Sequence, residues 1–101
     1  MTRVEATGHY HIIFNELRGA IQKRDSIVDA MRHRLQSLKG RGPTEIMDYD
    51  DNSFIHACTA LNGAQKEVRD LASRVNEYAS IAELPSVNLI NINIIGVVSR
   101  S

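Results

Sequence analysis

The chain has 101 residues, and its 12 Lys and Arg residues balance its 12 Asp and Glu residues. This length fits one small domain, and a hydrophobic content of 43% excludes a wholly disordered chain. A single cysteine excludes a disulfide framework or a multi-cysteine zinc site within one chain. The zero net charge removes any overall attraction to nucleic acid or an anionic membrane. We therefore expect one domain over residues 1–101.

Residues 1–9 are expected to form an N-terminal arm. They contain charged side chains and are not followed by an apolar run of the signal-peptide type. The longest uncharged stretch, residues 84–99, includes Ser, Asn, Pro and Gly and is shorter than the roughly 20 apolar residues of a membrane helix. We therefore expect a cytoplasmic protein that does not bind membranes.

A first helix is predicted over residues 10–39. Apolar residues recur there at spacings of three and four, which marks one apolar side of a coiled-coil-like helix. Arg24 is the polar exception in this series. A Gly-rich segment with a proline, residues 40–43, ends the helix. The apolar positions are Phe14, Leu17, Ile21, Val28, Met31, Leu35 and Leu38.

A second helix is predicted over residues 52–80, after a loop of residues 40–51. Acidic and polar residues at 48–53 supply side chains that can cap the helix N-terminus, and their negative charges interact favourably with the positive end of the helix dipole. The pair Asn62-Gly63 favours a turn, so it leaves open whether this helix is continuous. The apolar positions are Phe54, Ala57, Leu61, Ala64, Val68, Leu71, Val75 and Tyr78.

These two apolar series, here called the seam, predict a mainly α fold: an antiparallel two-helix hairpin of the coiled-coil type. End-to-end pairing places Leu17 opposite Val75 and Phe14 opposite Tyr78. A β-strand-like tail over residues 86–98 follows the hairpin, because isoleucines alternate there with asparagines. Such a strand pairs with another chain, packs on the hairpin, or forms a sheet with copies of itself.

Two helices alone cannot enclose a core, so we expect the fold to be completed by oligomerisation. Ile13 and Ile27 widen the apolar side of the first helix beyond what the second helix can cover, so we expect another chain to cover them. The tail isoleucines lie in an edge strand with no strand to pair with in the same chain, so we expect another chain to pair with them as well. The expected oligomer interface consists of Ile13, Ile27, Ile90, Ile92 and Ile94.

The charges are distributed unevenly along the chain. Residues 1–41 hold eight cations and four acids, whereas residues 42–83 hold three cations and eight acids. This polarity favours antiparallel packing within a hairpin and association between chains. It also allows the basic first helix to bind a nucleotide or nucleic acid, although no aromatic residues are interleaved with the cations. The residues of this alternative site are Arg18, Lys23, Arg24, Arg32 and Arg34.

Arg24 occupies a seam position opposite Val68. Three interpretations are open. Its charge binds a carboxylate or phosphate of a partner, or its polarity fixes the register of the helices. In the third, the aliphatic part of the side chain lies along the seam while the guanidinium reaches Glu67 or solvent.

No catalytic or metal-binding motif is present. His9 and His11 share a face only in an extended segment, and the further ligands that a metal needs cannot be assembled within one chain. The acids at 48–51 lack the mid-loop Gly and final Glu of a calcium loop. The sequence has no Gly-rich phosphate loop or activated nucleophile. We expect no enzyme activity, no cofactor and no metal.

In size and two-helix plan the chain is similar to the small secreted helical hairpins named for a Trp-x-Gly turn. It has no Trp, its turn reads Lys39-Gly40-Arg41-Gly42, and a strand-like tail stands in place of the secretion motif, so no function is carried over.

The function expected is that of a non-enzymatic, homo-oligomerising hairpin that serves as an assembly, adaptor or partner-binding module. The alternatives are a protein that sequesters an anionic ligand, and a chaperone or inhibitor that donates its tail strand to a partner.

Overall fold

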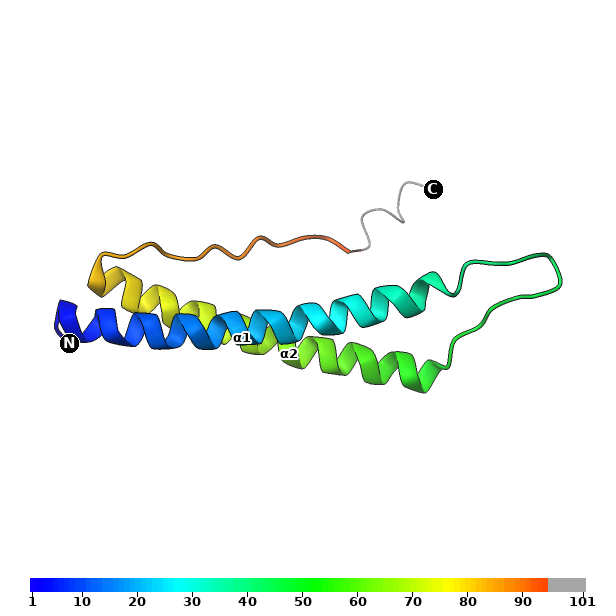
Figure 1. The fold of residues 1–101 in the computed structure, drawn as a ribbon, viewed down its shortest axis with the longest axis horizontal. Helices are drawn as coiled ribbons and strands as arrows, with labels where there is room; N and C mark the ends of the chain where they lie inside the picture. The colour runs from blue at the N-terminus through cyan, green and yellow to red at the C-terminus, as the bar shows by residue number, and fades with distance from the viewer. Residues whose placement is uncertain (95–101) are drawn as a thin grey trace.

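Two long helices make up most of the molecule. The structure is a computed structural model that describes residues 1–94. Helix α1 spans Arg3–Gln36 and helix α2 spans Asp51–Ala82. The helices lie side by side and run in opposite directions (Figure 1). Because the described residues form no sheet, the predicted mainly α hairpin is confirmed.

Helix α1 begins at Arg3, so residues 3–9 are helical and the predicted N-terminal arm is wrong. The reason is a capping box. The backbone N–H of Glu5 donates to Thr2 Oγ1 at 3.1 Å, and the backbone N–H of Thr2 donates to Glu5 Oε1 at 3.3 Å. The helix ends at Gln36, three residues before the predicted end, so the connecting loop spans residues 37–50.

Helix α2 is continuous through Asn62-Gly63, so the turn-favouring pair does not divide it. Its start is close to the prediction, because Asp50 is the N-cap and accepts hydrogen bonds from Asn52 N at 2.9 Å and Ser53 N at 3.2 Å. At the other end, Glu83 adopts a left-handed backbone conformation with φ 57°. This cap turns the chain away from the helix into the tail.

Burial is concentrated at one end of the hairpin. We call residues 3–21 and 64–82 the proximal half, near the chain termini, and residues 22–36 and 51–63 the distal half, near the loop. Within residues 1–94, every buried residue belongs to the proximal half. These residues are Ala6, Tyr10, Ile13, Leu17, Ala20, Ala64, Val68, Leu71, Ala72, Val75, Ala79 and Ala82.

The distal half leaves its seam only partly covered. Val28 and Leu35 occupy seam positions in α1, yet each is 41% exposed. The seam residues Met31 and Phe54 are half-buried. The hairpin therefore closes its apolar seam near the termini and not near the loop.

The register between the helices differs from the prediction. Arg24 Nη1 donates to Gln65 Oε1 at 2.8 Å, although the predicted pairing placed Arg24 opposite Val68. The ring of His9 stacks on Tyr78 with centroids 5.0 Å apart, in the place expected for Phe14. Both contacts are shifted in the same direction, by about one helical turn.

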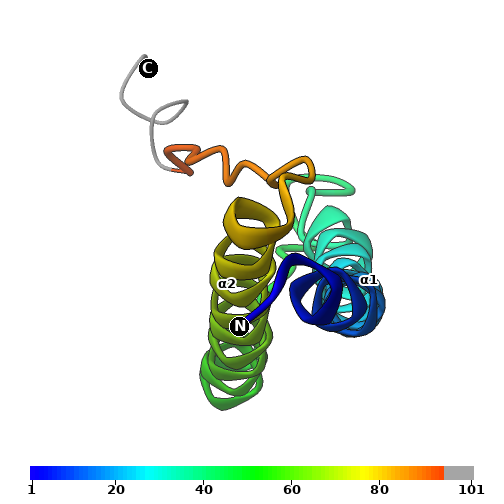
Figure 2. The same ribbon diagram turned by 90° about the vertical axis from the view of Figure 1, so that its left-hand side faces the viewer.

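The tail after α2 is extended but forms no strand in residues 83–94, so the strand-like tail is not observed there. It leaves the proximal end of the hairpin and runs back along it (Figures 1 and 2). The last part of the predicted strand, residues 95–98, lies outside the described residues.

Candidate functional site

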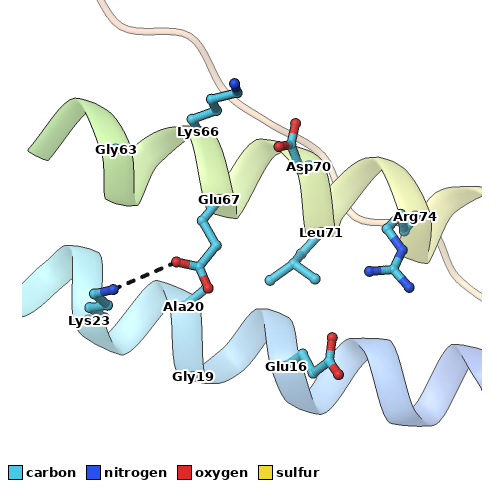
Figure 3. Close-up of a pocket in the computed structure, with 10 residues that line it drawn as sticks. All are labelled: Glu16, Gly19, Ala20, Lys23, Gly63, Lys66, Glu67, Asp70, Leu71 and Arg74. Atoms are coloured by element: carbon cyan, nitrogen blue, oxygen red, sulfur yellow. Dashed lines mark ion pairs between the residues drawn. The ribbon is translucent and has the colours of Figure 1, made fainter.

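A groove of about 570 Å³ lies between α1 and α2 near the middle of the hairpin (Figure 3). We call it the central groove. Small and apolar residues of both helices form its inner part: Gly19 and Ala20 from α1, and Gly63 and Leu71 from α2. Charged side chains line the rest of it. The result is a shallow surface with a narrow apolar floor and a charged rim.

The charged side chains of the central groove balance each other. Lys23 Nζ lies 3.8 Å from Glu67 Oε2, an ion pair that joins α1 to α2 across the groove. At the other end, Glu16 and Arg74 extend toward the opposite helix (Figure 3). The groove has three acids and three cations, so it has no net preference for an anion or a cation. Its charged residues are Glu16, Lys23, Lys66, Glu67, Asp70 and Arg74.

Two glycines of the central groove have no role within the chain that requires glycine. Neither Gly19 nor Gly63 has a positive φ, and a Cβ added at either would meet no atom within 4 Å. Glycine inside a helix costs about 1 kcal/mol relative to alanine. Packing between α1 and α2 therefore does not explain them, and both leave open space at the groove.

The predicted anion-binding residues are largely engaged with their neighbours. The guanidinium of Arg18 lies 5.1 Å from the centre of the Phe14 ring. Arg32 Nη2 lies 3.3 Å from Asp29 Oδ1, and Lys23 pairs with Glu67 as described. Arg34 lies near the loop, at a small pocket in the distal half. These side chains do not converge on one ligand position.

Arg24 places its stem along the seam and its head among polar neighbours. Its Nε donates to Asp25 Oδ1 at 2.8 Å, and its Nη1 donates to Gln65. The side chain is 28% exposed, so the charge is not fully buried. Of the three interpretations of Arg24, the geometry fits the stem along the seam, although the partners are Asp25 and Gln65 rather than Glu67.

The predicted interface isoleucines fall into different environments. Ile13 is 5% exposed and belongs to the hairpin core, so in this structure it does not form an exposed flank for a partner. Ile27 is half-buried in the distal half. The tail residues Ile90, Ile92 and Ile94 are 87%, 75% and 80% exposed.

The start of the tail is fixed to the helices by side chains that the sequence did not reveal. The side-chain amide of Asn76 donates to Val87 O at 3.0 Å and accepts from Val87 N at 2.8 Å. This pairing satisfies both backbone groups of Val87, as a neighbouring strand would. The hydroxyl of Tyr10 donates to Pro85 O at 2.9 Å, and Leu84 packs against the core.

Replacement of Asn76 by Ala is expected to release the tail from the hairpin. The backbone N–H of Val87 would lose its acceptor, at a cost of about 1 kcal/mol for local opening. Amide hydrogen exchange should show faster exchange at Val87, while amides in the core of α2 keep their rates. Asn62→Ala, at an exposed position of α2 that makes no hydrogen bond to Val87, is the matched control. Unchanged exchange at Val87 in the Asn76 variant would show that this pairing does not hold the tail.

Within residues 1–94 the structure forms no cluster of three or more His, Cys, Asp or Glu side chains suited to a metal ion. His9 and His11 lie on a helix, where residues two apart do not share a face. Cys58 is half-buried and has a free thiol.

A second, smaller pocket of about 160 Å³ lies in the distal half, next to the loop. Its lining is mainly apolar and comes from α1, the loop and α2. Tyr49 of the loop packs on Phe54 of α2, with ring centroids 5.1 Å apart. This pocket is part of the seam that the hairpin leaves open.

Neither helix of the described chain has a stretch long and apolar enough to cross a membrane. Comparison with known proteins gave no match to a family model, to a curated protein or to a solved structure.

Proposed function

We propose that this protein is a non-enzymatic helical hairpin that associates with copies of itself and acts as an assembly, adaptor or partner-binding module. The observation that carries this proposal is the uncovered seam of the distal half, where Val28 and Leu35 remain 41% exposed. Burial of seam residues stabilises the associated state in proportion to the apolar area removed from water. A second hairpin packed along the distal half supplies the cover that the chain lacks.

The accessible surface supports the same proposal. The chain exposes 8245 Å², whereas a compact monomer of 11.3 kDa exposes about 5,700 Å². The hairpin is 67 Å long and 18 Å across its thinnest direction. A molecule of this shape has long flanks, which are the surfaces that helical bundles bury.

The charge distribution also favours self-association. Cations predominate in α1, and acids predominate in the loop and α2. Because the total charge is zero, two copies are not repelled as whole molecules, and unlike regions attract when the copies are suitably aligned. We include a cytoplasmic location in the proposal, supported by the free thiol of Cys58.

Light scattering coupled to size-exclusion chromatography tests the proposal directly. The full chain is expected to have at least twice the monomer mass of 11.3 kDa at micromolar concentrations. A chain that ends after Ser86 separates the two predicted interfaces: a retained oligomer assigns association to the helices, and a monomer assigns it to the tail. A monomeric mass for both proteins at every concentration would refute self-association.

Donation of the tail to a partner is the second candidate, and the anchor at Val87 favours it. Asn76 holds the tail in an extended conformation at its start, and the isoleucines beyond the anchor are exposed. An extended segment with alternating isoleucines suits addition to the edge of a partner's sheet. The anionic-ligand alternative has less support, because the basic side chains of α1 do not converge and several are already paired.

A further inference from the structure

One side of α2 carries a row of exposed side chains whose order is nearly symmetric. The row begins at Ile55 and ends at Ile81, and its members are separated by four or seven residues, so they lie along one side of the helix. All of them are exposed. Lys66 and Asp70, at the centre of the row, project from α2 on the side away from α1 (Figure 3). The row consists of Ile55, Thr59, Lys66, Asp70, Glu77 and Ile81.

Val68 marks the midpoint of this row. Lys66 and Asp70 lie two residues on either side of it, and Ile55 and Ile81 lie 13 residues on either side. An antiparallel copy of α2, centred at the same position, therefore places Lys66 opposite Asp70 twice and Ile55 opposite Ile81 twice. A two-fold interface requires this kind of self-complementary surface.

We propose that this row is the surface by which two copies of the chain associate, with their α2 helices antiparallel about a two-fold axis near Val68. The inference rests on the proposed self-association and names a face for it that is separate from the uncovered seam. The occupant of the row is a second copy of the chain, because reversal about Val68 places the cation Lys66 opposite the anion Asp70 and one exposed isoleucine opposite the other.

The central charges are available for this contact. Lys66 and Asp70 stand four residues apart on one helix, yet neither forms an ion pair with any residue of the described chain 1–94. Their unlike charges therefore have no partner within that part of the chain. In the antiparallel arrangement each meets the opposite charge of the other copy.

The apolar ends of the row are exposed as well. Ile55 is 61% exposed and Ile81 is 44% exposed, and within residues 1–94 they are the large apolar side chains of α2 that remain exposed. In the antiparallel arrangement each covers the other at the two ends of the contact. Gly63 faces Ser73 of the second copy near the centre, and the open space at Gly63 lets the two helices approach closely.

This arrangement also brings a neighbour to the distal half. Because the two α2 helices are antiparallel, the part of α2 between Asp51 and Gly63 lies beside the proximal half of the other copy. The well-packed end of each hairpin thus supports the open end of the other. The contact lies on the side of α2 away from α1, so it supports the distal part of α2 without covering Val28 and Leu35 of the seam.

Charge reversal tests the proposed contact in a way that distinguishes weaker association from loss of folding. Lys66→Glu brings two carboxylates together at each central contact, and Asp70→Lys brings two ammonium groups together. Each variant alone should therefore dissociate about tenfold more readily than the unmodified chain. An equimolar mixture of the two variants restores unlike charges at both contacts of a mixed dimer. At one contact the native Asp70 and Lys66 meet, and at the other the two substituted side chains meet with their charges exchanged. The mixture should therefore form a heterodimer that is tighter than either variant alone, measured by sedimentation velocity.

Matched controls use the exposed pair on α1. Arg32→Glu and Asp29→Lys make the same changes in net charge at positions outside the row and should leave the dissociation constant unchanged. Circular dichroism confirms that each variant keeps its helix content.

The outcomes separate this inference from the proposed function. If the unmodified chain associates and the single variants associate equally well, or their mixture gains nothing, the α2 row is not the interface and self-association stands. If the unmodified chain is monomeric at all concentrations, both proposals fail. Weakened single variants and a strengthened mixture establish the antiparallel α2 interface.

Discussion

Replacement of Leu17 by Ala is expected to destabilise the hairpin by about 2–5 kcal/mol. Leu17 is 3% exposed and lies in the core among residues of both helices. Removal of its side chain leaves a cavity in the core. The two helices cannot move together to fill it without disturbing the contacts of neighbouring core residues. A small domain has only about 5–15 kcal/mol of stability, so this variant should be largely unfolded under mild denaturing conditions.

The matched control for Leu17→Ala is Leu35→Ala, the same change in the same helix at a seam position in the distal half. Leu35 is 41% exposed, so less apolar area is lost in one hairpin and no enclosed cavity forms, and we expect a smaller cost of about 1 kcal/mol at high dilution. Urea denaturation followed by circular dichroism measures both values. Equal costs at the two positions would contradict a core confined to the proximal half.

The two helices could be predicted from the sequence because a long apolar series with helical spacing is rarely found in strands or loops. Apolar residues at spacings of three and four over eight positions indicate a helix in almost any context. The early start of α1 was missed because residues 1–9 have no apolar series, although Thr2 and Glu5 have the spacing of a capping box. That spacing was the signal that could have placed the helix start at Arg3.

The register was not determined by the seam. A seam that repeats every seven residues offers similar apolar pairings when one helix is displaced by about a turn. Polar contacts select among them, and here Arg24 reaches Gln65 and His9 stacks on Tyr78. Such contacts depend on the positions of several side chains at once, which one-dimensional spacing does not describe.

The uneven burial along the seam was also not predicted. Periodicity identifies which side of each helix is apolar, but it does not state how closely two helices approach at each level. Small residues such as Ala72 and Ala79 permit close packing in the proximal half, where both are 2% exposed. The placement of Ile13 in the core, rather than on an interface, follows from this close packing.

The hydrogen bonds between Asn76 and Val87 could not be predicted from the sequence. Asn76 is one of several polar residues in the second helix, and nothing in its spacing distinguishes it from exposed neighbours. Its role depends on the left-handed turn at Glu83, which brings Val87 back to the side of α2. The central groove was likewise missed, although Gly19 and Gly63 are unusual inside helices and are its sequence signal.

The hairpin is proposed to complete its structure by association with another copy, so its amide hydrogen exchange should depend on protein concentration. The proximal half has its own core, so its backbone amides should be protected at every concentration. Helices of the distal half have little tertiary support in one hairpin, and helices of this length are marginal without such support. Their amides should exchange rapidly in dilute protein and slowly when copies associate.

Amide hydrogen exchange at two concentrations, one well below and one well above the dissociation constant found by light scattering, distinguishes the isolated hairpin from the associated one. We expect amide protection in residues 22–36 and 51–63 to rise at least tenfold at the higher concentration, because each 1.4 kcal/mol of association free energy corresponds to a factor of ten. Protection in residues 64–82 should change little. Equal protection of the distal half at both concentrations would contradict the proposed completion by a second copy, because one hairpin would then be structurally complete.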